Sequence, residues 1–252
     1  MKVKIVIATH KRYRVPSDEL YLPVQAGRAV HDDLGYTGDD TGDHISMKNE
    51  SYCELTALYW AWKNLKADAV GLCHYRRYFA GKTLGGKWER ILTLRQAQKL
   101  LEKADILLPN PRNYRIETNH TQYAHAHHAK DLDTAREVIS ERFSEYLPAF
   151  DRVMRRTWGH RFNMIVARWE VLDRYCSWLF DILGELEQRL DLTGYSAYDR
   201  RVFGFIAERL LDVWLETERP RYRELAVVNM ESQHWPRKIA AFLVRKFRIK
   251  KG

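Results

Sequence analysis

The segment 74–78, His-Tyr-Arg-Arg-Tyr, contains the residue types that most directly indicate binding chemistry. It follows the apolar run 69–73, which has the composition of a buried strand. Two adjacent arginines directly after a buried strand are poor core residues, and each guanidinium offers a planar fork of N–H donors that matches phosphate oxygens. The alternative is a solvated loop with a surface ion pair. We predict anion recognition by four residues of this segment: His74, Tyr75, Arg76 and Arg77.

A second polar cluster follows the first predicted strand. Residues 3–8 are mostly apolar and β-branched, and they lead into Thr9, His10 and Lys11. Ligands of open α/β sheets bind at the carboxyl ends of strands, so two basic clusters at one sheet edge predict a diphosphate pocket. Neither the GxxxxGK phosphate loop nor GxGxxG follows this strand. We therefore expect side chains to hold the phosphates.

The stretch 42–49, Gly-Asp-His-Ile-Ser-Met-Lys-Asn, precedes a predicted helix. A capped helix entrance explains Ser46 or Asn49 as N-terminal residues. It does not explain why an acid, an imidazole and an amine occur together in the same stretch. The alternative prediction is a binding role for Asp43, His44, Lys48 and Asn49.

Metal-binding patterns are weak in this sequence. Four histidines between 120 and 128 lack a spacing such as HExxH, so we predict no zinc site. Asp39, Asp40 and Asp43 offer carboxylate oxygens, which hard cations prefer. However, the buried strand 69–73 leads into cations instead of an acidic pair, and fixed cations can neutralise a diphosphate leaving group. We expect no cofactor and no essential divalent metal.

The elements that must position these groups alternate between strands and helices, which predicts an α/β fold with a mostly parallel sheet flanked by helices and a helical C-terminal part. We predict that the long stretch 13–48 is irregular, and that it has a functional role because long irregular segments in compact domains usually do. Trp60 and Trp62 lie two residues apart in a predicted helix, so we expect one of them to be partly exposed. Strands are predicted at 3–8, 69–73, 104–108 and 162–167, and helices from 49 to 65 and at 93–103, 131–142, 144–156, 170–190 and 197–215.

Composition restricts the classes of protein. The 252 residues carry a formal net charge of +9, and 45% are apolar, which excludes a disordered, collagenous or coiled-coil chain. Three cysteines far apart form no disulfide framework, which indicates a reducing, cytosolic compartment. No segment has the roughly 20 apolar residues that a membrane span requires.

The positive charge is concentrated in the tail 236–252, which holds seven basic residues and no acid, leaving +2 for the rest. Apolar residues of this tail gather on one side of a helical wheel. We predict an interfacial helix on an anionic membrane surface, with a disordered basic tail as the alternative. The charge also permits a nucleic-acid-binding module, but no helix-turn-helix, zinc-finger, RNP or KH pattern appears, so we expect no nucleic-acid partner.

Several unusual stretches occur together and resemble one bacterial family. The most characteristic is Gly-Leu-Cys-His-Tyr-Arg-Arg-Tyr-Phe at 71–79. Over about residues 3–216 the chain resembles capsular and exopolysaccharide biosynthesis proteins described as a domain of unknown function. It is also similar to the galactofuranosyltransferase module of certain O-antigen polymerases. Further matching stretches are 8–11, 42–49, 52–64, 162–164, 175–180 and 201–209.

This resemblance implies a GT-A-type glycosyltransferase domain at 1–216, with a nucleotide-binding part at about 1–110, an acceptor part at about 111–216 and an extension at 217–252. It implies a nucleotide-diphosphate sugar donor, with UDP-galactofuranose as a candidate, and a surface polysaccharide or lipid-linked glycan as acceptor. The basic tail 236–252 predicts a peripheral protein at the inner face of the cytoplasmic membrane. The alternatives are the nucleic-acid-binding module and a non-catalytic subunit of a polysaccharide assembly complex.

The resemblance also suggests roles for single residues. His10 and Lys11 would meet the nucleotide or its phosphates, and the arginines after strand 69–73 would take the place of the metal in other GT-A enzymes. An inverting transfer needs a base for the acceptor hydroxyl, for which we predict Asp199, with Asp43 and His128 as alternatives. Arg201 completes the predicted donor-binding set. Glu208 lies among apolar residues, so we expect it to pair with an arginine.

Overall fold

The computed structural model describes residues 1–231. The predicted membrane-binding tail, 236–252, lies outside the described residues. No helix within 1–231 combines the length and apolar character needed to cross a membrane.

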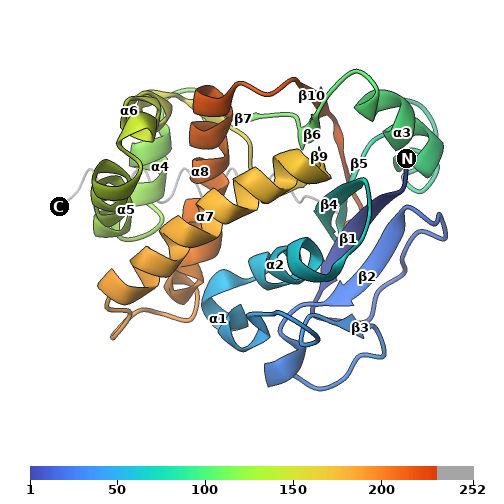
Figure 1. The fold of residues 1–252 in the computed structure, drawn as a ribbon, viewed down its shortest axis with the longest axis horizontal. Helices are drawn as coiled ribbons and strands as arrows, with labels where there is room; N and C mark the ends of the chain where they lie inside the picture. Colours follow the sequence, from blue (N-terminus) through green and yellow to red (C-terminus); the bar gives the residue numbers. More distant parts are fainter. Residues whose placement is uncertain (232–252) are drawn as a thin grey trace.

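The core of the fold is a nine-stranded mixed sheet (Figure 1). Its main path runs in the order β10-β6-β9-β4-β1-β2-β3, and β5 connects β4 to β11. The longest ladders, β1 with β2 and β1 with β4, are parallel, whereas β9 runs antiparallel to β4 and β6. The strands are β1 (Val3–Thr9), β2 (Tyr21–Gln25), β3 (Thr37–Gly38), β4 (Ala69–His74), β5 (Arg77–Phe79), β6 (Ile106–Pro109), β9 (Ile165–Arg168), β10 (Tyr222–Leu225) and β11 (Val227–Asn229).

Alternation along β1 divides the apolar core between two faces of the sheet. Val6 and Ala8 pack into the larger cluster, under α2 and α7, and Ile5 and Ile7 pack into the smaller one, which includes residues of α3. The α helices are α1 (Asn49–Tyr52), α2 (Leu55–Asn64), α3 (Leu94–Leu101), α4 (Asn119–Ala124), α5 (Ala129–Arg142), α6 (Leu147–Arg155), α7 (Trp169–Arg189) and α8 (Val202–Glu218).

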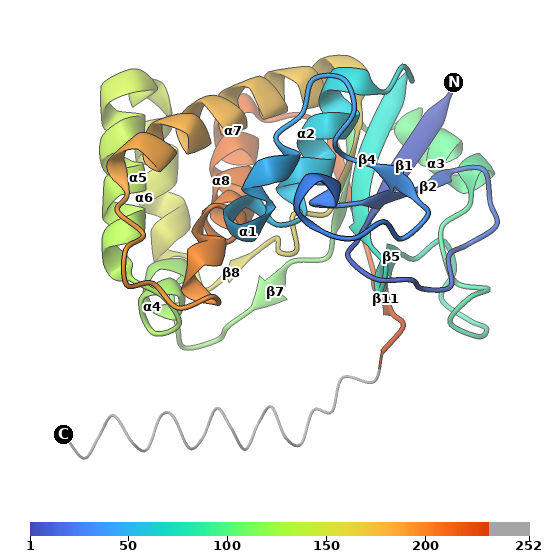
Figure 2. The same cartoon turned by 90° about the horizontal axis from the view of Figure 1, so that it is seen from below.

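The helices α4, α5, α6 and α8 gather beside the sheet, and α7 extends from the sheet across them (Figures 1 and 2). A two-stranded ribbon of β7 (Arg112–Asn113) and β8 (Trp158–Gly159) lies next to this helical part. The short 3-10 helices are η1 (Arg28–Val30), η2 (Ser46–Lys48), η3 (Ser144–Tyr146) and η4 (Asp199–Arg201). These layers confirm the predicted α/β class with a helical part.

Two expectations about local structure were wrong. The stretch 13–48, predicted to be irregular, contributes β2 and β3 to the sheet. A proline argues against a central strand, so Pro23 led to the wrong prediction for β2. The structure accommodates it because β3 pairs only with Val24 and Gln25, which leaves Pro23 at an open edge of the sheet. The single helix predicted from 49 to 65 is broken at Cys53, whose φ of 52° is left-handed and separates α1 from α2.

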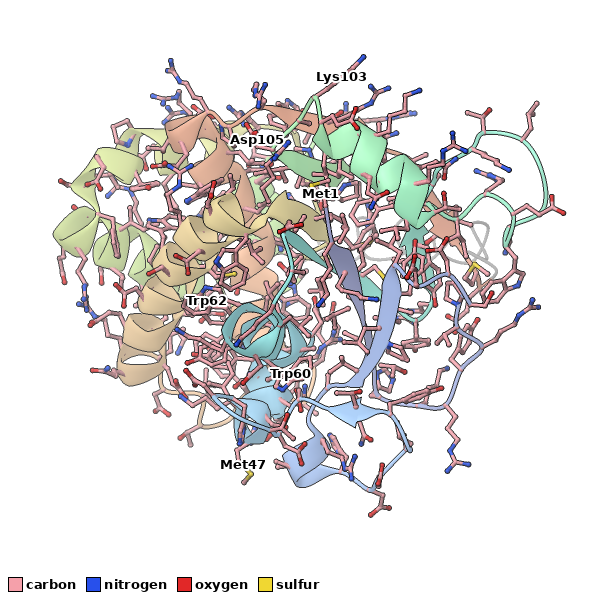
Figure 3. All side chains as sticks on the ribbon, turned by 45° about the vertical axis from the view of Figure 1, so that its right-hand side comes forward. Met1, Met47, Trp60, Trp62, Lys103 and Asp105 are labelled. Carbon is pink, nitrogen blue, oxygen red and sulfur yellow. The ribbon has the colours of Figure 1, made fainter. Side chains whose placement is uncertain are left out.

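Trp60 and Trp62 are both buried, against the expectation that one is partly exposed. They leave α2 in different directions (Figure 3). The Trp60 indole donates to Thr41 Oγ1 at 2.8 Å, and the Trp62 indole donates to Asp173 on α7 at 2.7 Å. Helix α2 therefore has two covered sides, one under the 37–48 segment and one under α7.

The predicted boundary between the transferase domain and the extension stays a prediction. Residues of that extension form β10 and β11, which pair with β6 and β5 in the central sheet.

Gly71 provides a direct test of the packing between β4 and β9. A Cβ on Gly71 would lie 2.6 Å from the carbonyl oxygen of Ile165, so we expect Gly71→Ala to lower the free energy of unfolding by about 2 kcal/mol. A Cβ on Gly184, inside α7, would meet nothing within 4 Å, and we expect Gly184→Ala to raise that free energy by about 0.5–1 kcal/mol. Urea unfolding of the two variants measures both values, and equal effects would contradict the close strand contact.

Candidate functional site

A cavity of about 850 Å³ opens at the carboxyl ends of β1 and β4. Its walls come from the strand ends, the α1–α2 break, the turn before β9, the β7 region and the first half of α8. Four carboxylates line it: Asp32, Glu50, Glu54 and Glu208. Basic and imidazole side chains outnumber them: His10, His31, His74, Arg76, Arg77, Arg112, His127, Arg161, Arg201 and Arg209. The cavity is therefore suited to an anionic ligand.

Most of the predicted donor-binding residues line this cavity. They are Thr9, His10, Asn49, His74, Tyr75, Arg76, Arg77 and Arg201. Lys11, Asp43, His44 and Lys48 are not among the lining residues. Lys48 pairs with Glu187 at 2.6 Å, and His44 Nδ1 accepts the backbone N–H of Ser46 at 3.3 Å. Both of these side chains brace the entrance of α1.

The two strand ends lie side by side because β1 and β4 pair in parallel, with Ala8 opposite His74. The hydroxyl of Thr9 donates a hydrogen bond to the carbonyl oxygen of Lys11 at 2.6 Å and so stabilises the turn after β1. His10 packs edge-on against Tyr75, with ring centroids 5.2 Å apart. Burial and the nearby Lys11 and Arg76 lower the pKa of His10, so its imidazole is uncharged at neutral pH.

The adjacent arginines of the 74–77 turn face different surroundings. Arg76 is half-exposed and pairs with Glu231 at 3.3 Å, and Lys11 lies 3.7 Å from the same carboxylate. The guanidinium of Arg77 lies 4.4 Å from the ring centroid of Phe162. Burial and Arg76 lower the pKa of Arg77, which nonetheless remains a cation at neutral pH. Arg77 is thus held against an aromatic ring inside the cavity.

A strained turn at 162–163 organises the centre of the cavity. Phe162 and Asn163 have φ values of 76° and 52°, a left-handed conformation that costs a non-glycine residue on the order of 1 kcal/mol. The Phe162 carbonyl oxygen accepts Nε2–H of His74 at 2.6 Å, and its N–H donates to Glu208 at 2.9 Å. The Asn163 amide donates to Glu54 at 2.8 Å. The turn therefore fixes one imidazole and two carboxylates.

Sequence reasoning placed a strand at 162–167 and missed this turn. The strand β9 begins only at Ile165. The carboxylates that the turn holds were also missed as site residues, although Glu208 was expected to pair with an arginine. It does so, because Arg209 Nη1 lies 3.2 Å from Glu208 Oε2. The unusual position of a glutamate within the apolar face of α8 was the available signal.

Two buried arginines form the deep wall of the cavity. Arg161 donates Nε–H to the Tyr114 hydroxyl at 2.7 Å and lies 3.6 Å from Asp212. Arg209 is 3% exposed at its side chain and donates to the Phe205 carbonyl and to Gln122. Burial and the neighbouring Arg161 lower the pKa of Arg209. Burying guanidinium groups of this kind costs free energy, and each N–H donor that finds a partner offsets part of that cost.

None of the three predicted catalytic groups lines the cavity. Asp43 accepts the Tyr59 hydroxyl at 3.1 Å on the outer side of α2. The His128 ring packs on Tyr195, with centroids 4.2 Å apart. Asp199 approaches the cavity indirectly, because its Oδ1 lies 3.6 Å from Nδ1 of His127, a lining residue.

His127 is an imidazole that sequence reasoning did not single out for catalysis. Its ring stacks on Phe205, with centroids 4.1 Å apart. Burial and Arg209 lower the pKa of His127 to about 4, so it is neutral at physiological pH. Within residues 1–231, no group of three or more His, Cys, Asp or Glu side chains is arranged to hold a metal ion.

Cys53 is the cavity cysteine and accepts Nε–H of Arg201 at 3.2 Å. Burial raises the pKa of the Cys53 thiol to about 11. We expect alkylation by iodoacetamide at pH 8 to be roughly a hundredfold slower than for a free thiol, since the thiolate is the reactive form. Mass spectrometry of time points measures the rate, with the unfolded protein as control. Reaction at the rate of the unfolded chain would contradict the buried, protonated thiol.

Comparison with known proteins supports the fold and the family. The solved apo structure of the WbbM bifunctional glycosyltransferase superposes with a TM-score of 0.86 at 31% sequence identity. The match covers 92% of this chain and 46% of the other, so this chain spans about half the length of that protein. A search of curated proteins finds no match. Residues 4–219 match the family model described as a domain of unknown function, DUF4422. The sequence resemblance is thereby confirmed, and the chain belongs to the DUF4422 family.

Proposed function

We propose that this chain is a glycosyltransferase that moves a sugar from a nucleotide-diphosphate donor to a hydroxyl group of a glycan. One observation carries the proposal: the basic cavity opens at the carboxyl ends of β1 and β4, in a chain whose fold matches a solved bifunctional glycosyltransferase at 31% identity. Open α/β sheets bind nucleotides at such strand ends.

The donor diphosphate would contact Arg76 and Arg77 on one side and Arg201 on the other. These guanidinium groups offer planar N–H forks to the phosphate oxygens. The nucleoside would lie beside the loop 31–34, whose backbone is held by Gln25. The Gln25 side chain donates to the Asp32 carbonyl oxygen at 2.7 Å and accepts the Leu34 N–H at 2.8 Å, which gives the loop a defined shape.

The same cations support transfer without an essential metal. When the glycosidic bond to the donor breaks, negative charge develops on the diphosphate, and fixed guanidinium groups already face it. The β4 strand ends at His74 and is followed by Tyr75 and two arginines, with no carboxylate pair in that turn. Metal independence therefore remains our prediction, to be tested by chelation.

The proposed donor and acceptor come from the sequence resemblance, and the proposed membrane contact comes from the basic tail. It favours UDP-galactofuranose as donor and a surface polysaccharide or lipid-linked glycan as acceptor. The tail 236–252 would bring the chain to the anionic inner face of the membrane, where a lipid-linked acceptor is available.

Arginine variants test the donor site. We expect Arg77→Gln and Arg76→Gln each to weaken UDP binding about tenfold, because each removes a charge-assisted contact. The control is Arg95→Gln, since Arg95 is an exposed residue of α3 outside the cavity lining. Isothermal titration calorimetry of UDP in the presence of EDTA measures the affinities. UDP binding that requires manganese, or that all three variants keep, would contradict the arginine site.

For the transfer step we propose Glu208 as the general base. Its two oxygens accept the Phe162 N–H and pair with Arg209, and a carboxylate retains further lone pairs for an acceptor hydroxyl. The acceptor oxygen would form a bond to the anomeric carbon as the bond to the diphosphate breaks. The bonding electrons go to the leaving phosphate oxygen, and the hydroxyl proton goes to Glu208.

A pair of amide variants distinguishes Glu208 from Asp199, the base predicted from the sequence. We expect Glu208→Gln to lower kcat by about 10²–10⁴-fold with UDP affinity unchanged, because a positioned general base typically contributes that factor. We expect Asp199→Asn to change kcat by less than about tenfold, since Asp199 reaches the cavity only through His127. The rate of UDP release from the nucleotide sugar that the wild type uses as donor measures kcat for both variants. A larger loss of kcat in Asp199→Asn than in Glu208→Gln would assign the base to Asp199.

A further inference from the structure

We propose that four cavity-lining residues, Arg112, Tyr114, Gln122 and Arg209, form a second anion site, which binds a carboxylate or phosphate group carried by the acceptor glycan. This inference rests on the proposed glycosyl transfer and names the chemical class of its acceptor. We call these four residues the acceptor wall.

Arg209 is the buried centre of the acceptor wall. Its Nη1 donates to the Phe205 carbonyl oxygen at 2.8 Å and lies 3.2 Å from Glu208, and its Nη2 donates to Gln122 Oε1 at 2.5 Å. The Nε atom is also buried but has no hydrogen-bond partner among residues 1–231. A side chain 3% exposed therefore holds an unused N–H donor on a cavity-lining residue. A buried donor without a partner is costly, which favours a movement of the Arg209 side chain that brings Nε to the cavity surface, where a ligand oxygen would satisfy it.

The neighbours of Arg209 also present donors. The Tyr114 oxygen accepts Nε–H of Arg161, so the hydroxyl proton of Tyr114 is available for another acceptor. The oxygen of the Gln122 amide is taken by Arg209, which leaves its NH₂ group as the free end. The guanidinium of Arg112 lies 5.3 Å from the Tyr114 ring centroid and forms no ion pair within the described part of the chain.

This arrangement favours a group that only accepts hydrogen bonds. Ionised carboxylates and phosphates are such groups, whereas a neutral sugar hydroxyl both donates and accepts. The charges agree with that chemistry. Arg161 lies near Asp212, and Arg209 is paired with Glu208, so Arg112 contributes an uncompensated positive charge. An anionic substituent of the acceptor would neutralise that charge.

The acceptor wall and the arginines that follow β4 come from different elements around one cavity. Arg112 belongs to the β7–β8 ribbon, which lies between α4 and β5 in both ribbon views (Figures 1 and 2). Glu208 connects the two regions. One of its oxygens pairs with Arg209, and the other accepts the N–H of Phe162. The guanidinium of Arg77 lies over the ring of that same phenylalanine. An acceptor anchored on the wall would therefore present a hydroxyl near Glu208.

Binding of matched oligosaccharides tests the inference. The probes are a glucose-terminated tetrasaccharide, its glucuronate-terminated counterpart and its 6-phosphate counterpart, titrated into the full chain saturated with UDP. We expect the wild type to bind at least one acidic probe about tenfold or more tightly than the neutral probe, as one charge-assisted contact provides. The acidic probe that binds more tightly identifies the natural group as a uronate or as a phosphate.

Two variants assign the effect to the wall. Arg112→Gln should remove the preference for the acidic probe, and because Arg112 is exposed this change leaves the core intact. Gln122→Glu keeps an oxygen for Arg209 but adds a negative charge, so it should reverse the preference. Arg95→Gln is the matched control and should keep it. All three variants should retain the UDP affinity of the wild type.

The contradicting outcomes are distinct. Equal affinity of the wild type for acidic and neutral probes, with UDP still bound, would overturn the inference and leave the proposed function intact. A loss of UDP affinity in Arg112→Gln that matches the loss in Arg77→Gln would assign the wall to the donor diphosphate instead. Failure of the wild type to bind UDP or any nucleotide sugar would overturn the proposed function and the acceptor role together.

Discussion

The left-handed turn at Phe162 and Asn163 is the constraint that holds the site together. The backbone of Phe162 accepts a hydrogen bond from His74 at its carbonyl oxygen and donates one to Glu208 from its N–H, while the side chain of Asn163 donates to Glu54. These partners come from β4, from α8 and from the residue that precedes α2, so the turn connects parts of the chain between residues 54 and 208. Backbone strain of this kind persists when surrounding structure determines it, and three elements do so here.

The second constraint is the charge that the cavity concentrates. Arg161 and Arg209 have almost no exposed surface, and taking guanidinium groups from water is costly unless their donors are satisfied. The nearby carboxylates of Asp212 and Glu208 offset part of this cost. Arg77, Arg112 and Arg201 form no ion pair within residues 1–231, and all three line the cavity, where a ligand can reach them. The cavity thus presents cations before any anion binds, which would reduce the reorganisation needed during the proposed transfer.

Sequence patterns predicted the parts of the site that local order controls. A β-branched run followed by basic residues predicts where a strand ends, and parallel pairing of β1 with β4 then brings His10 and Arg76 to one edge. The residues of the acceptor wall were not predictable in this way. Arg112 and Arg209 line one cavity only because tertiary packing places β7 and α8 around it. The glutamate within the apolar face of α8 was the one sequence signal, and it predicts an ion pair as readily as a site residue.

Local rules also failed where tertiary structure overrides propensity. The proline in β2 concealed an edge of the sheet, and the helical pattern from 49 to 65 gave no sign of the break at Cys53. That break allows Cys53 and Glu54 to line the cavity. It is therefore a feature of the site that periodicity could not predict, because a single left-handed residue leaves the apolar spacing on both sides unchanged.

A crystal structure of the chain with UDP, grown in EDTA, is the decisive measurement for a metal-independent arginine site. We expect density for the diphosphate against Arg76, Arg77 and Arg201, with the uridine beside the loop 31–34 and the acceptor wall open. Diphosphate bound at Arg112 and Arg209, or nucleotide bound outside the cavity, would contradict the proposed donor site.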